Sequence, residues 1–374
     1  MRSVAVLAAL TLAGLSCGGT SSAGHSPTPS ASAGTSANPS GSPPGSVGSY
    51  GLLLSAGTLE MIGPTGKVVA TATVAAPTPH TCGQGTAAVL QPPVSATTDK
   101  VYFRDGDTKI RWLTPDGQTG DATTVPGGAS KISFFSVSPD DQRIAVLVED
   151  LSPATTVSLS LYVEDLIGHA NHSVIYTNSA PKLKNGNTLW PMGWHQGELV
   201  LAVYPPCTFE PRGITPSEWH VSNATTAVRI ATIRSTNCTL SEFPSPAGVG
   251  CINAQGVTTL YDWTGKVVAV TGPGSQGAGY PQTGLSPAGG SIYFAISVGI
   301  GASSAATRIV QLGPGPFATV QGHAACAWID EDHLLAPDAV IQFPAETPGN
   351  AQVTATVTPL AASGECAGRF PGGL

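Results

Sequence analysis

Residues 134–148 read Phe-Phe-Ser-Val-Ser-Pro-Asp-Asp-Gln-Arg-Ile-Ala-Val-Leu-Val, and this stretch is the clearest copy of a pattern that recurs along the chain. Two apolar runs flank the sequence Ser-Pro-Asp-Asp at residues 138–141. Proline presets a backbone dihedral that turns require, and aspartate accepts hydrogen bonds from nearby backbone amides. The stretch therefore predicts a β-hairpin whose second strand, residues 144–148, is buried between neighbouring parts of the fold.

Hairpins of two kinds recur along the chain. Turns followed by strongly apolar strands occur at residues 97–100, 195–197, 287–290 and 330–332, and strands followed by Asp, Pro or Gly turns occur at 108–117, 159–168 and 258–268. The two kinds alternate with a period of roughly 40 to 50 residues, which is typical of four-stranded propeller blades. We assign blades to residues 80–128, 129–180, 185–236, 243–274, 278–321 and 323–360.

The strands predicted at residues 50–76 belong to none of these blades. We expect them to close the ring by pairing with strands from the C-terminal end, which removes two open sheet edges. The sequence thus predicts an all-β fold, a β-propeller of six or seven four-stranded blades, with seven preferred. A pair of β-sandwich domains is the alternative, because short strands with regular turns also occur in sandwiches.

Composition supports an all-β chain. Its 374 residues include 45 Gly and 32 Pro, and only 10% are charged, so turn formers are abundant and helix-forming charged runs are rare. The net charge of -7 is dispersed and no block of Lys or Arg occurs. We therefore expect no nucleic-acid partner.

The N-terminal region predicts export and membrane anchoring. Residues 1–17 have a basic start, an apolar run and then Ser16-Cys17, which is typical of a signal peptide. They resemble the lipobox of bacterial lipoproteins, in which the cysteine is acylated, although Gly14 and Leu15 depart from the usual residues. We expect Cys17 to be lipidated; an ordinary cleaved signal and a secreted protein are the alternative. Residues 18–49 are almost wholly Ser, Pro, Gly, Ala and Thr, and predict a disordered tether before a propeller domain at 50–374.

Six cysteines remain apart from Cys17, and none forms a Cys-x-x-Cys pair. An even number fits three disulfides in an oxidising compartment. Cys238 and Cys251 are joined by a loop rich in Pro and Gly, so we expect them to pair. The pairing of the other four stays open: Cys82, Cys207, Cys326 and Cys366.

Residues 137–145 resemble the Ser-Pro-Asp-Gly-Lys-x-Ile-Ala repeat of TolB-like (WD40-like) bacterial propellers, with Asp141 in place of the usual glycine. Residues 285–293 form a second, looser copy. The resemblance implies the propeller fold. It implies function only broadly, because such modules in the cell envelope mostly bind proteins or act as scaffolds, and a minority carry enzymes on their central face.

Candidate chemical groups are few. His169 and His172 stand three residues apart, as metal-binding histidines on a helical turn would, but they fall in a predicted β-turn with only Asp165 noted beside them. The acidic residues at 140–141 and 330–332 also fall in predicted turns, where solvation explains them. No nucleophile elbow occurs. We expect no catalytic, cofactor or metal site.

Residues 190–195, Trp-Pro-Met-Gly-Trp-His, are the densest aromatic stretch. Packing of Trp194 between blades is one interpretation, and a ligand platform formed by Trp190, Trp194 and His195 beside the central channel is the other. Together these features predict a monomeric, lipid-anchored module in the bacterial cell envelope that binds an unidentified envelope protein or ligand. An extracytoplasmic hydrolase or lyase that uses the central channel is the alternative.

Overall fold

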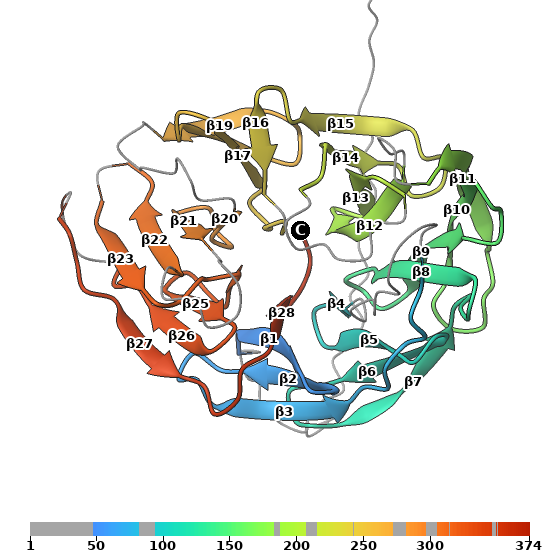
Figure 1. The fold of residues 1–374 in the computed structure, drawn as a ribbon, viewed down its shortest axis with the longest axis horizontal. Coiled ribbons are helices and arrows are strands. Elements are labelled where there is room, and N and C mark those ends of the chain that lie inside the picture. The colour runs from blue at the N-terminus through green and yellow to red at the C-terminus, as the bar shows by residue number, and fades with distance from the viewer. Residues whose placement is uncertain are drawn as a thin grey trace, which may run out of the picture. The chain divides into compact units, whose positions relative to one another are not determined.

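The computed structural model describes residues 48–81, 94–182, 188–206, 215–241, 243–271, 282–296, 305–313, 315–345, 349 and 351–374. All regular secondary structure among them is β-strand, arranged in seven four-stranded antiparallel sheets around a common centre (Figure 1). We call these sheets blades 1 to 7. The described residues include no helix long and apolar enough to span a membrane.

The strands of each blade follow one another in the chain, except in blade 1. Blade 1 contains β28 (Glu365–Phe370), β1 (Tyr50–Ser55), β2 (Thr58–Ile62) and β3 (Val68–Thr73). Blade 2 contains β4 (Val94–Ala96), β5 (Val101–Asp105), β6 (Lys109–Leu113) and β7 (Thr119–Thr124). Blade 3 contains β8 (Lys131–Val137), β9 (Arg143–Asp150), β10 (Thr156–Asp165) and β11 (Ser173–Pro181). Blade 4 contains β12 (Thr188–His195), β13 (Glu198–Tyr204), β14 (Glu218–Ser222) and β15 (Arg229–Arg234).

The remaining three blades have the same order. Blade 5 contains β16 (Cys238–Leu240), β17 (Val249–Asn253), β18 (Thr258–Tyr261) and β19 (Val267–Thr271). Blade 6 contains β20 (Gln282–Leu285), β21 (Ser291–Ile296), β22 (Ala306–Gln311) and β23 (Phe317–Gln321). Blade 7 contains β24 (Ala327–Trp328), β25 (His333–Ala336), β26 (Ala339–Gln342) and β27 (Thr356–Pro359). The propeller prediction is confirmed, with seven blades.

The ring closes through blade 1. β28 pairs antiparallel with β1, with Tyr50 opposite Phe370, so the C-terminal strand completes the sheet begun by the N-terminal strands, as expected. A disulfide between Cys326, just before β24, and Cys366 on β28 links blade 7 to blade 1 at this seam. Strand pairing and a covalent bond therefore both hold the two ends of the ring together.

One blade boundary differs from its prediction. Blade 5 begins with β16 at Cys238–Leu240, ahead of the boundary expected at residue 243. A three-residue strand is too short to display the period-two pattern on which strand prediction depends. Cys238 on β16 forms a disulfide with Cys251 on β17, the pair favoured by the sequence.

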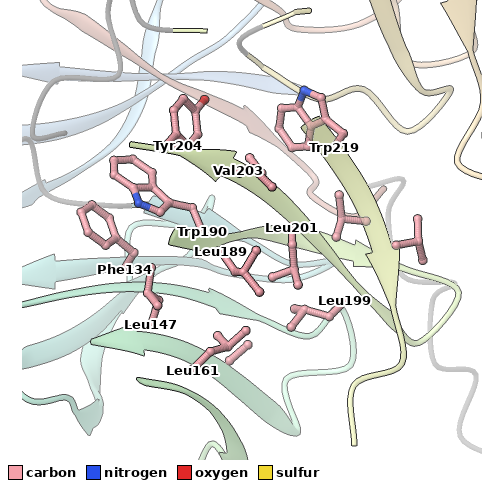
Figure 2. Close-up of a cluster of buried hydrophobic side chains, with 14 of the residues drawn as sticks. Phe134, Leu147, Leu161, Leu189, Trp190, Leu199, Leu201, Val203, Tyr204 and Trp219 are labelled. Carbon is pink, nitrogen blue, oxygen red and sulfur yellow. The ribbon is translucent and has the colours of Figure 1, made fainter. Parts of the chain in front are cut away.

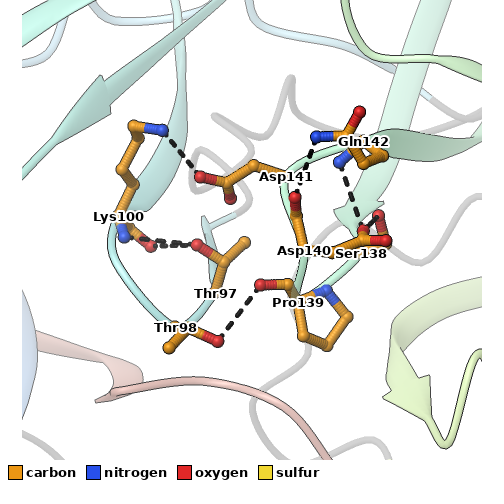
Figure 3. A network of polar contacts seen from close by, with 8 residues as sticks. All are labelled: Thr97, Thr98, Lys100, Ser138, Pro139, Asp140, Asp141 and Gln142. Atoms are coloured by element: carbon orange, nitrogen blue, oxygen red, sulfur yellow. Dashed lines mark hydrogen bonds and ion pairs between the residues drawn. The ribbon is translucent and has the colours of Figure 1, made fainter. Parts of the chain in front are cut away.

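The hairpin at residues 134–148 forms β8 and β9, with Phe135 opposite Val146. Val146 is fully buried. Asp141 has a backbone φ of 59°, which explains why glycine is usual at this position of the repeat. Figure 3 shows that the turn also joins two blades: Asp141 Oδ2 lies 2.6 Å from Lys100 Nζ, and the Thr98 hydroxyl donates to the Pro139 carbonyl. The acidic residues of this stretch are turn residues.

The hydrophobic core lies between neighbouring blades. In blades 3 and 4, Leu147 and Leu161 face Leu189, Leu199 and Leu201, and all five are buried (Figure 2). Strands of adjacent blades thus contribute apolar residues to the contact between them, which is why the strands in the middle of each blade are apolar over most of their length.

Candidate functional site: the central channel

A cavity of ≈ 240 Å³ lies where the innermost strands of the blades converge. Its wall contains residues of β28, β4, β8, β12, β20 and β24, together with residues 243–246 of blade 5. All seven blades therefore contribute to it. The cavity is the central channel of the propeller.

Aromatic side chains form the wall of the channel on the side of blades 3 and 4. The Trp190 ring stacks on Phe134 with centroids 3.8 Å apart and lies 4.8 Å from the Tyr204 ring (Figure 2). Trp190 is only 5% exposed, and its Nε1 has no hydrogen-bond partner among the described residues. An indole N–H left unpaired in an apolar wall is a donor for a ligand acceptor.

Trp194 contacts the neighbouring blade and also lines the channel. Its Nε1 donates to the Ser136 carbonyl of β8 at 3.3 Å, and the Arg143 guanidinium lies 4.7 Å from its ring centroid. The residue therefore packs between blades 3 and 4, as one of the two interpretations expects. Trp190 and Trp194 line the channel.

His195, the third residue of the predicted platform, is not among the residues that line the channel. Its Nδ1 is 2.7 Å from the Leu374 carbonyl oxygen. The structure thus brings the aromatic stretch to the channel, with its two tryptophans in the wall and its histidine in contact with the C-terminal segment.

Residues 372–374 cross the channel mouth and form part of the lining. The Gly372 amide donates to the Thr97 carbonyl of blade 2, and the Leu374 amide donates to the Trp194 carbonyl of blade 4. A Cβ on Gly193 would overlap the Leu374 side chain, so the glycine provides the space for this leucine. Figure 1 places the end of the chain near the centre of the ring.

Arg369 is the only charged side chain among the described residues of the channel wall. Its Nε is buried and has no hydrogen-bond partner within the described ranges. Burial lowers the pKa of Arg369, and the nearby Glu331 and Asp330 only partly oppose this effect. The channel therefore combines an apolar wall with one incompletely solvated positive charge.

The two carboxylates whose charges act on Arg369, Glu331 and Asp330, already accept hydrogen bonds from other groups. Glu331 accepts hydrogen bonds from the Ser286 hydroxyl and the Ala288 amide of blade 6. Asp330 accepts from the backbone amides of Asp332 and His333 and contacts the His333 ring. These acidic residues are turn and blade-linking residues, and none belongs to the channel wall as described.

The two closely spaced histidines, His169 and His172, both contact one carboxylate. His169 Nδ1 and His172 Nδ1 each lie 2.7 Å from one oxygen of the buried Glu164 carboxylate. Asp165, the carboxylate noted from the sequence, instead accepts a hydrogen bond from Asn171. No group of three or more metal-ligating side chains occurs in the described ranges. Glu164 could not be selected from the sequence, because its side chain points from β10 toward a turn whose shape the spacing alone does not define.

Arg369 and Phe134 were also missed as channel residues. Arg369 is one of 16 basic residues in the chain, and nothing in its neighbours distinguishes it from a solvated arginine. The relevant signal would be its place on the innermost strand of blade 1, which becomes known only when the ring is closed.

Comparisons with known proteins assign no family. No known protein family and no curated protein matches the sequence. Among solved structures, a chain of the mitotic checkpoint complex is 10% identical over 89% of this chain and 89% of that chain, with a TM-score of 0.42. BamB from Moraxella catarrhalis is 12% identical over 79% of this chain and 78% of that chain (TM-score 0.34), and Sqt1 from Chaetomium thermophilum is 11% identical over 79% and 76% (TM-score 0.41). Similarities this low assign neither a family nor a function.

Proposed function

We propose that this protein is an extracytoplasmic, membrane-anchored binding module, akin to TolB-like propellers, that holds a component of the cell envelope in its central channel. The observation that carries the proposal is the position of Trp190 and Trp194 in the channel wall with Phe134. Ligand sites are concave, mostly apolar and lined by aromatic residues with a few polar groups, and this wall has that composition.

The proposed location rests on the sequence and on the disulfides. The bonds Cys238–Cys251 and Cys326–Cys366 are of the kind that persists in oxidising compartments. Cys17, residues 1–17 and nearly all of the proposed tether at 18–49 lie outside the described residues, as do Cys82 and Cys207. Acylation of Cys17 would hold the propeller at the membrane, with the tether as a spacer.

An extracytoplasmic hydrolase or lyase in the channel is the alternative function. Such an enzyme needs a nucleophile, a general acid or a base that converge on one point. The described part of the wall offers one arginine and a few serines, but no histidine, aspartate or glutamate side chain. This wall favours binding over catalysis.

A channel-filling substitution tests the binding function. Ala367 on β28 lines the channel, so Ala367→Phe should occupy part of the cavity, whereas Val268→Phe on the exposed surface of β19 is a matched control. The full-length proteins are incubated with an organic extract of bacterial envelopes, and bound molecules are identified by native mass spectrometry. We expect a component to bind the parent protein and the Val268→Phe control but not Ala367→Phe. Equal retention by all three proteins, or turnover of an added glycan or ester substrate, would contradict the proposal.

A further inference from the structure

We propose that the ligand of the channel is an apolar monocarboxylate, with its carboxylate bound by Arg369 and its apolar body against the aromatic wall of blades 3 and 4. This inference rests on the proposed binding function and specifies the chemical class of the ligand.

The charge of Arg369 supports an anionic group. Arg369 lines the channel, and its buried Nε has no hydrogen-bond partner among the described residues. An unpaired charge in an apolar environment is costly, and it is offset most effectively by an opposite charge with hydrogen bonds. A carboxylate matches the planar guanidinium, which can bind both oxygens at once.

Asp330 and Glu331 do not fill this role. Both lie near enough to raise the pKa of Arg369, yet burial outweighs their effect. Their oxygens are occupied by Ser286, Ala288 and the turn around His333. The Arg369 Nε–H thus stays without an acceptor among the residues that the structure describes.

The rest of the channel supports an apolar body with little other polarity. Met192, Tyr293 and Trp328 extend the wall formed by Phe134 and Trp190 around the ring. The Trp328 Nε1 already donates to the Gly284 carbonyl, whereas the Trp190 Nε1 finds no acceptor among the residues described. A single further acceptor on the ligand, such as a carbonyl or ether oxygen, would satisfy Trp190.

The size of the cavity limits the ligand. Its ≈ 240 Å³ lies just below the range of roughly 300 to 1,000 Å³ found for drug-sized ligands. A carboxylate with a short alkyl chain or one ring fits these limits.

Octanoate, octan-1-ol and octylammonium provide three probes with the same chain and different head groups. Binding to the full-length protein is measured by isothermal titration calorimetry below the micellar range of the probes. We expect the parent protein to prefer octanoate, with octylammonium the weakest. Arg369→Gln should weaken octanoate binding roughly tenfold or more and leave octan-1-ol unchanged, because only the charged hydrogen bonds are lost. Arg369→Lys should retain much of the preference, and Arg234→Gln on the outer strand β15 is the control.

The outcomes separate this inference from the proposed function. Equal affinity for octanoate and octan-1-ol in the parent protein, or unchanged octanoate binding by Arg369→Gln, would overturn the inference while the channel remains a binding site. Uptake of an envelope component without binding of octanoate would also overturn the inference alone. Absence of both would overturn the inference and the proposed function together. If Arg369→Gln does not fold, the probe preference of the parent protein and of Arg369→Lys decides.

Discussion

A buried histidine should make the stability of this propeller depend on pH. His220 on β14 is 2% exposed, and neither of its ring nitrogens has a hydrogen-bond partner in the part of the chain that the structure describes. Its charged neighbours are Glu218, with Oε1 3.7 Å from the His220 Nδ1, and Arg229, which is 3.0 Å from the same carboxylate oxygen. Burial, and secondarily the charge of Arg229, lower the pKa of His220 from 6.5 to about 4, while Glu218 opposes them.

The sign of the effect follows from this lowered pKa. Between pH 6.5 and 4 the unfolded chain binds a proton at His220 and the folded chain largely does not, so the free energy of unfolding falls as the pH falls through this window. A pKa lowered from 6.5 to about 4 means that His220 alone reduces the free energy of unfolding by about 3 kcal/mol when the pH falls through this window. We expect His220→Phe to lose that much less stability than the parent protein when the pH is lowered from 7.5 to 4.

Urea titrations at both pH values, followed by intrinsic fluorescence, measure this difference. Any packing defect of the phenylalanine shifts stability at both pH values and cancels in the comparison. His333→Phe is a control of opposite sign: its hydrogen bond to Asp330 raises the pKa of His333, so its stabilisation is present below pH 6.5 and lost as the pH rises through the folded pKa. Parallel pH dependence of the parent protein and His220→Phe would refute the reasoning.

Three further predictions concern the core, the ring closure and the anchor. Val146→Asp places an unpaired charge at a fully buried position and should lower the free energy of unfolding by about 3 to 5 kcal/mol, whereas Val268→Asp on the exposed face of β19 should lower it little. Thermal melts and secreted yields of both variants measure this difference. An unchanged melting temperature for Val146→Asp would contradict the inter-blade core. Replacing Cys326 and Cys366 by serine should lower the free energy of unfolding by about 4 kcal/mol in the chain-entropy model, measured by non-reducing denaturant titration, and a loss no larger than experimental error would show that strand pairing alone closes the ring. Cys17→Ala should move the full-length protein from the detergent phase to the aqueous phase in a bacterial host, and continued membrane retention would rule out the acyl anchor.

Much of the fold could be predicted because propeller blades are built from local hairpins. The turn at residues 138–141 and the apolar strand at 144–148 are specified by residues next to one another in the chain, and the structure has them as β8 and β9. The β16 strand was missed for the converse reason, since its three residues are held by pairing with β17 rather than by a pattern of their own.

The candidate site was predictable only in part. The clustering of aromatic residues at positions 190–195 indicated Trp190 and Trp194 as candidates, but it did not decide whether they face a channel or a blade interface. The structure shows both contacts for Trp194. Arg369 could not be selected, because its importance depends on the apolar residues that other blades place around it.

The strand-forming segments, the turn chemistry and the all-β class follow from the amino-acid sequence, since they depend on short-range backbone preferences and on alternation of apolar residues. Tertiary structure alone decided the number of blades, through the pairing of Tyr50 with Phe370 across nearly the whole chain. It also decided which side chains meet in the channel and that Glu164 binds two histidines. Such contacts depend on ring closure and strand register, which are properties of all seven blades together and leave no local trace in the sequence.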